Sequence, residues 1–177
     1  ALFFQEEEMF GHTDKKRIAV AAMLLVASVI FCEAALAYVL KTTDTGRAVR
    51  WNKNHVRIVL DSSLAGVGPM DQVESLVIAA FDEWVDTAEL PVEFSFTKGH
   101  CSGMGYDPFG DNENCVMADT EVFEGSRAAA RTFLSYDNNT GIIKDADIVI
   151  KAGISRWSIK GNRGGLDLRS AVLHEVG

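Results

Sequence analysis

The last ten residues of the chain, LRSAVLHEVG (168–177), hold the pair of side chains best suited to metal chemistry, His174 and Glu175. On an α-helix, positions four apart lie about 40° apart around the axis, so a histidine four residues after His174 would point at the same metal ion. Glu175 lies about 100° from His174, where a carboxylate reaches a water on that metal without being a ligand. The pair fits metal-assisted hydrolysis, but the last helix taken alone favours a surface His-Glu pair on an ordinary amphipathic helix.

Two cysteines, Cys101 and Cys115, remain if an export signal containing Cys32 is removed. An even pair in an exported chain indicates a disulfide, and closing a loop of about 15 residues stabilises a fold by about 3 kcal/mol. The intervening residues, SGMGYDPFGDNEN, are polar and turn-forming, so a bridge would hold them together. Two buried thiols are the alternative.

Three acidic residues near these cysteines, Asp107, Asp111 and Glu113, are of the type that binds Ca²⁺. Their spacing is not that of an EF-hand loop. A solvated loop is therefore favoured over a calcium site.

The first elements expected to position these groups form a β-α-β unit. HVRIVLD (55–61) alternates like a half-buried strand, with Val56, Ile58 and Leu60 on one face. MDQVESLVIAAFDEWVDT (70–87) has helical apolar spacing, and PVEFSFT (91–97) alternates again. A strand, a helix and a strand in this order make the two strands parallel.

The second half of the chain predicts three more strands and a final helix. CVMAD (115–119) is a short strand, and ARTFLSYDNNTGIIKDADIVIK (130–151) is two strands joined through the turn-forming DNNTG. Asp167 is a plausible N-cap for the last helix, whose Leu168, Val172 and Val176 are expected to face the sheet. No repeat or linker divides residues 38–177, so one domain is expected there.

The N-terminal 37 residues have the composition of an export signal. Residues 18–31 carry no charge, follow the basic KKR, and precede Ala35-Leu36-Ala37, which fits a cleavage site before Tyr38. The alternative is an uncleaved membrane anchor over residues 18–40. The net charge of −8, without a basic cluster, argues against nucleic acid as a partner.

The ordered blocks RWNKNHVRIVLDSSL, AAFDEW, VEFSFT, SYDNNTGIIKDADIVI and LDLRSAVLHEVG resemble the matrixin-like metzincin zinc proteases, which include secreted bacterial members. The resemblance covers about residues 50–177. The family pattern is HExxHxxGxxH followed by a methionine turn. This chain has His174 and Glu175 of that pattern and reaches Gly177, the position before the second histidine, so we expect truncation within the motif.

The resemblance implies an α+β fold, the zincin or metzincin upper subdomain. That subdomain has a twisted, mostly parallel five-stranded sheet, two long helices and one antiparallel edge strand beside the zinc cleft. By its order in the chain, the edge strand is expected near residues 128–136. A peptide substrate would add to it as a further strand, and the residues expected to bind it are Ala129, Ala130, Arg131, Thr132 and Phe133.

The implied activity is that of a secreted or periplasmic zinc endopeptidase, acting as a monomer on peptide or protein substrates. Three histidines, His174 among them, would hold Zn²⁺, and Glu175 would take a proton from water and pass it to the leaving amine. With one of three ligands, residues 1–177 are expected to be inactive alone. The membrane would matter only for the signal or the anchor. The alternative function is an exported binding module without catalytic activity.

Overall fold

The computed structural model describes residues 40–105, 112–154, 157–159 and 165–177. Residues 42–177 form one unit by their internal contacts. The predicted signal (1–37) lies outside the described residues, as does the alternative anchor (18–40) apart from its last residue. Among the described residues, no helix combines the length and the apolar character needed to cross a membrane.

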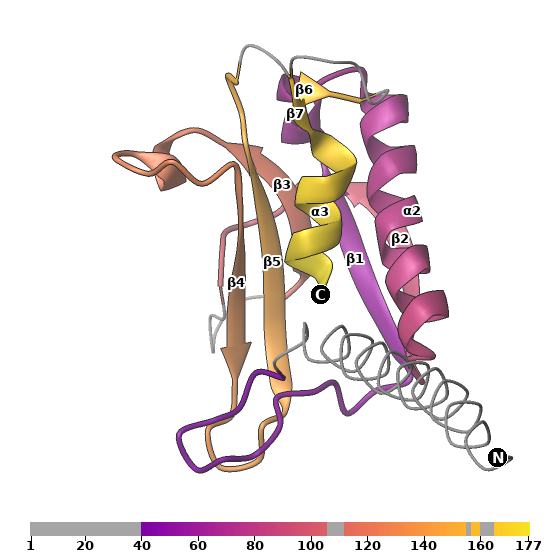
Figure 1. Ribbon diagram of the computed structural model, residues 1–177, viewed down its shortest axis with the longest axis vertical. Coiled ribbons are helices and arrows are strands. Elements are labelled where there is room, and N and C mark those ends of the chain that lie inside the picture. Colours follow the sequence, from indigo (N-terminus) through magenta and orange to yellow (C-terminus); the bar gives the residue numbers. More distant parts are fainter. Residues whose placement is uncertain (1–39, 106–111, 155–156, 160–164) are drawn as a thin grey trace, which may run out of the picture. The chain divides into compact units, whose positions relative to one another are not determined.

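The described elements are of the α+β class that the sequence predicted (Figure 1). In chain order they are β1 (His55–Asp61), the 3-10 helix η2 (Ser62–Gly66), α2 (Met70–Ala88), β2 (Glu93–Gly99), β3 (Asn114–Asp119), the 3-10 helix η3 (Glu121–Phe123), β4 (Ala130–Tyr136), β5 (Ile143–Lys151), β6 (Trp157–Ser158), β7 (Leu166–Asp167) and α3 (Leu168–Val176).

Five of these strands form one sheet in the order β2-β1-β3-β5-β4. Neighbours from β2 to β5 run parallel, whereas β4 pairs with β5 in the antiparallel direction and lies at the edge. The predicted mostly parallel sheet with one antiparallel edge strand is therefore confirmed. The sequence pattern did not predict the two 3-10 helices or the short parallel pair of β6 and β7.

The β1-α2-β2 unit has the predicted parallel strands, because α2 carries the chain back along the sheet. One side of α2 is apolar and packs on the strands that it connects. The ring of Phe81 makes edge-on contacts with Phe94 and Phe96 of β2, at centroid distances of 4.9 and 5.3 Å. Figure 1 shows α2 and α3 side by side on one face of the sheet.

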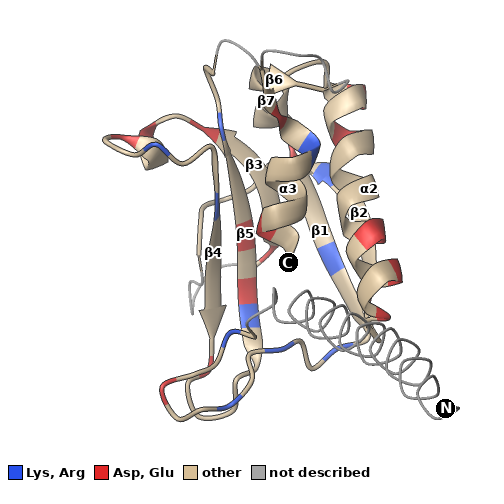
Figure 2. Cartoon of the chain, viewed as in Figure 1, with Lys and Arg blue, Asp and Glu red and all other residues tan. Residues whose placement is uncertain are grey.

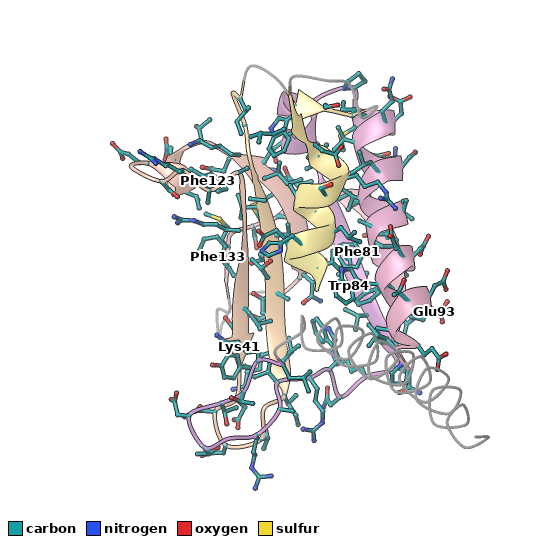
Figure 3. The ribbon with its side chains drawn as sticks, in the orientation of Figure 1. Lys41, Phe81, Trp84, Glu93, Phe123 and Phe133 are labelled. Atoms are coloured by element: carbon teal, nitrogen blue, oxygen red, sulfur yellow. A yellow bond between two sulfur atoms is a disulfide. The ribbon has the colours of Figure 1, made fainter. Side chains whose placement is uncertain are left out.

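Apolar cores form on both faces of the sheet. Val56, Ile58 and Leu60 of β1 pack with α2 and α3, while Val59 packs on the opposite face with the two cysteines. The prediction of a half-buried strand was therefore wrong for the second half of β1, where both faces are covered. In Figure 3, Phe81 and Trp84 lie at the helices α2 and α3, whereas Phe123 and Phe133 lie near β4, away from these helices. Phe123 and Phe133 belong to the second core.

The DNNTG segment forms the predicted turn between β4 and β5. The Asp137 carboxylate accepts hydrogen bonds from the backbone N–H groups of Asn139 and Thr140 and from the Thr140 hydroxyl, at 2.9 to 3.0 Å. The bonds from Thr140 are the main reason that the pKa of Asp137 is lowered. Segment 42–50 packs on this turn, and the N–H of Arg50 donates to the Gly141 carbonyl (2.9 Å).

Gly141→Ala is expected to lower the free energy of unfolding by about 2 kcal/mol. Gly141 has a φ of +74°, which costs a residue with a Cβ about 1 kcal/mol or more. Its Cβ would also overlap the backbone carbonyl of Ala48. Gly125→Ala is the matched control, because Gly125 has a φ of +68° with open space around a Cβ. Urea unfolding of both variants tests this, and equal losses would show that the contact with Ala48 is unimportant.

The final helix begins where the sequence predicted. Asp167 is its N-cap, and its carboxylate accepts from the backbone N–H of Ser170 (3.0 Å). Leu168 and Val172 are completely buried in the helix-side core, and Val176 packs against it in part, as expected. Of the two long helices predicted, α2 has 19 residues, and the given sequence contains nine residues of α3.

Candidate functional site

His174 and Glu175 lie in the last turn of α3. His174 is exposed, whereas Glu175 is partly covered. The Asp167 cap and the burial of Leu168 and Val172 determine which side of the helix faces the sheet. His174, two positions after the buried Val172, is therefore directed away from the core.

Trp84 of α2 holds this last turn from one side. Its indole Nε1 donates a hydrogen bond to the Leu173 carbonyl (2.5 Å). Gly177 lies so close to the indole that any Cβ at this position would overlap the ring. The sequence indicated Trp84 only as an apolar position on α2. Its contact with the turn that carries His174 joins residues 89 positions apart, which periodicity does not reveal.

The predicted substrate strand, residues 128–136, matches β4 closely, and Ala129 immediately precedes it. The backbone N–H of Lys151 donates to the Ala129 carbonyl (2.9 Å). Because the backbone N–H and C=O groups of alternate residues point to the same side of a strand, those of Ala129, Arg131 and Phe133 point toward β5. The backbone groups of Ala130, Thr132 and Leu134 consequently face the outer edge, where no described strand pairs with them. Of the five residues predicted to bind substrate, only Ala130 and Thr132 are placed to pair with a peptide.

The side chains of Arg131 and Phe133 belong to the opposite face of the sheet from α3. The Arg131 guanidinium lies 5.6 Å from the centre of the Phe123 ring and donates to the Val122 carbonyl (3.2 Å). Phe133 packs against the core that contains the disulfide. These two side chains therefore stabilise the sheet and do not line the α3 side.

Thr132 brings the edge strand and the final helix together. Its hydroxyl Oγ1 lies 2.8 Å from the Glu175 side-chain Oε2 and 2.8 Å from the Glu175 main-chain oxygen. The structure therefore joins two predicted site residues that the sequence placed in separate elements, 43 positions apart. No local sequence pattern indicates this contact.

The described residues contain no group of three His, Cys, Asp or Glu side chains that could hold a metal ion. His174 would supply one imidazole ligand. The other two described histidines have different neighbours: His55 lies near Ser95 (2.9 Å) on β2, and His100 lies beside Asp61 (3.1 Å).

The two cysteines lie on the face of the sheet opposite α3. Cys101 and Cys115 are joined by a disulfide, with their Cα atoms 6.4 Å apart. The backbone N–H of Cys115 donates to the buried Asp147 carboxylate (2.9 Å), and that of Cys101 donates to the buried Asp61 carboxylate (2.7 Å). Figure 2 shows acidic positions in the middle of β5, the strand that carries Asp147.

The calcium hypothesis falls mostly on residues that the structure does not describe. Asp107 and Asp111 lie outside the described part of the chain. Glu113, the third acidic residue, forms an ion pair with Arg57 of β1.

Asp61→Asn is expected to lower the free energy of unfolding by about 2 kcal/mol at pH 7. Burial alone would raise the pKa of Asp61, but hydrogen bonds from Ser63 and Cys101 and the charge of His100 together lower it. A lowered pKa in the folded state stabilises the protein above the ordinary value of about 3.9, and this contribution disappears as the pH falls through the folded-state pKa. The difference between wild type and variant should therefore shrink below about pH 4.

Urea unfolding between pH 7 and pH 3 measures this difference. Asp71→Asn removes one charge from an exposed position at the start of α2 and is the control. A constant difference between Asp61→Asn and wild type over this range would contradict the prediction.

The site thus consists of an exposed histidine, a glutamate held by a threonine of the edge strand, and a tryptophan beneath the same helical turn. An imidazole can bind a metal, a carboxylate can accept a proton, and an unpaired strand edge can bind an extended peptide. No protein-family model matches the chain, and no curated protein matches it.

Proposed function

We propose that this chain is the N-terminal part of the catalytic domain of a secreted zinc endopeptidase that resembles the matrixin-like metzincins. The proposal depends above all on one observation. Glu175, the expected proton acceptor, contacts Thr132 of the antiparallel edge strand, and His174, the expected zinc ligand, is its exposed neighbour. A peptide paired with β4 would therefore lie beside both groups.

The described residues are compatible with zinc but do not complete a site. His174 is on the exposed side of α3, where its imidazole is accessible to a metal ion. Zinc in proteases has three protein ligands and one open position. We propose that a continuation beyond Gly177 supplies the two further histidines of the HExxHxxGxxH pattern.

When bound, zinc would act as a Lewis acid on the substrate carbonyl and lower the pKa of water. Glu175 would accept a proton from water and deliver it to the leaving amine, as general bases and acids do. Ala130 and Thr132 would hold the peptide by main-chain hydrogen bonds along the outer edge of β4, the mode used when a strand is added to a sheet.

The gene sequence beyond the codon for Gly177 gives the first test. We expect a histidine codon immediately, then glycine three residues later and histidine three residues after that. The purified full-length product should bind about one zinc per chain and cleave a casein substrate, and chelation should abolish the cleavage.

An unrelated continuation, or a zinc-free product that folds and cleaves nothing, would favour the exported binding module instead. N-terminal sequencing of the exported product tests the proposed signal. It should start at Tyr38, and an intact N-terminus in the membrane fraction would indicate the anchor.

A further inference from the structure

The hydroxyl of Thr132 has two acceptors on one residue. Oγ1 lies 2.8 Å from the side-chain Oε2 of Glu175 and 2.8 Å from its main-chain oxygen. A hydroxyl has a single hydrogen, so it donates to one of these oxygens at a time. When the hydroxyl donates to Oε2, it holds the Glu175 carboxylate next to the middle of β4; when it donates to the main-chain oxygen, it holds the backbone of the same residue there.

Both sides of this contact are rigidly supported. Thr132 pairs with Ile148 of β5, and its β-branched side chain has a restricted χ1 angle. On the other side, Trp84 holds the Leu173 carbonyl one half-turn before Glu175. Groups held by strands and helices are placed more accurately than groups on loops.

The main chain of Thr132 has a different role from its side chain. Its backbone N–H and C=O point away from β5, toward the outer edge of β4. A peptide that adds to β4 would form hydrogen bonds with these groups. One residue thus contacts the bound peptide through its backbone and Glu175 through its hydroxyl.

We propose that Thr132 is a positioning residue: its hydroxyl fixes the Glu175 carboxylate at a set place relative to a peptide bound on β4. This inference rests on the proposed function of Glu175 as the proton acceptor. It adds a residue that the motif around His174 and Glu175 does not contain. Because a misplacement of about 1 Å can reduce a rate by about 100-fold, the loss of this hydrogen bond should be visible in turnover.

The test uses the full-length protein with three substitutions. Thr132→Val keeps the shape and β-branching of the side chain but removes the hydroxyl, and Thr132→Ser keeps the hydroxyl. Thr97→Val makes the same change at an exposed position of β2, the other edge strand of the sheet, and is the matched control.

We expect Thr132→Val to lower kcat about 10- to 100-fold, with KM, zinc content and thermal stability nearly unchanged. KM should change little because the backbone that binds the peptide is retained. Thr132→Ser should restore most of kcat, and Thr97→Val should behave as wild type. An unchanged kcat in Thr132→Val would overturn the proposal, as would a loss that Thr132→Ser does not restore.

A second measurement does not depend on catalysis. In protein labelled with ¹³C at glutamate Cδ, the Glu175 carboxylate resonance is the one that disappears in Glu175→Gln. It should move in Thr132→Val and stay nearly in place in Thr132→Ser and Thr97→Val. If wild type has no zinc-dependent activity, the proposed function fails, and this resonance still decides the contact. A resonance unaffected by Thr132→Val would overturn the positioning role whatever the activity.

Discussion

Glu175→Gln is expected to keep zinc bound while its peptidase turnover falls by about 100- to 10,000-fold. This holds for a chain that continues through the third histidine and the methionine turn. Glutamine has nearly the same shape as glutamate, and its amide oxygen can still accept the hydrogen bond from Thr132. It cannot accept a proton at neutral pH. The variant therefore separates proton transfer from the placement of the side chain.

His174→Ala should lose both zinc and activity, because it removes one of three protein ligands. Metal analysis and steady-state kinetics on the two variants make the comparison. Near-normal turnover of Glu175→Gln with zinc bound would show that Glu175 is not the base. Equal loss of zinc from both variants would make Glu175 a ligand or a structural residue.

Removal of the Cys101–Cys115 disulfide should lower the free energy of unfolding by about 3 kcal/mol, since the bridge closes a loop with a sequence separation of 14. Both cysteine N–H groups also donate to buried carboxylates, Asp61 and Asp147. When the loop loosens, these carboxylates lose bonding partners in a buried setting, which adds to the cost. The double variant Cys101→Ser, Cys115→Ser should therefore melt about 10 °C lower.

Thermal unfolding with and without a reducing agent provides the control for this prediction. Reduction should bring the wild-type melting temperature close to that of the double variant and should leave the double variant unchanged. Mass analysis of non-reduced peptides from exported protein should find Cys101 linked to Cys115. Two free thiols, or an equally stable double variant, would contradict the prediction.

The main elements of the fold were predictable because their patterns are local. The alternation of Val56, Ile58 and Leu60 indicated β1, and the turn-forming DNNTG indicated the β4–β5 connection. The cap residue Asp167 marked the start of α3. The local pattern could not predict that Val59 is also buried, because this depends on what covers the second face of the sheet.

The candidate site was predictable in its residue types and only partly in its geometry. The sequence indicated Glu175, and the family resemblance implied a substrate-binding segment around residues 128–136. It did not distinguish Thr132, which faces α3, from Arg131 and Phe133, which belong to the opposite face. A shift of one residue in the register of β4 would exchange these two sets, since successive side chains of a strand alternate between faces.

The sequence by itself determined the strand and helix segments and the His174-Glu175 pair, because these depend on short-range periodicity and residue chemistry, whereas the α+β class was implied by the family that the ordered blocks resemble. Only the tertiary structure decided that Thr132 meets Glu175 and that Trp84 meets Leu173, across separations of 43 and 89 residues. Such contacts depend on the strand order, the register of β4 and the packing of α3 on α2. All three result from the burial of apolar surface along the whole chain in one fold. A local sequence pattern therefore cannot predict them.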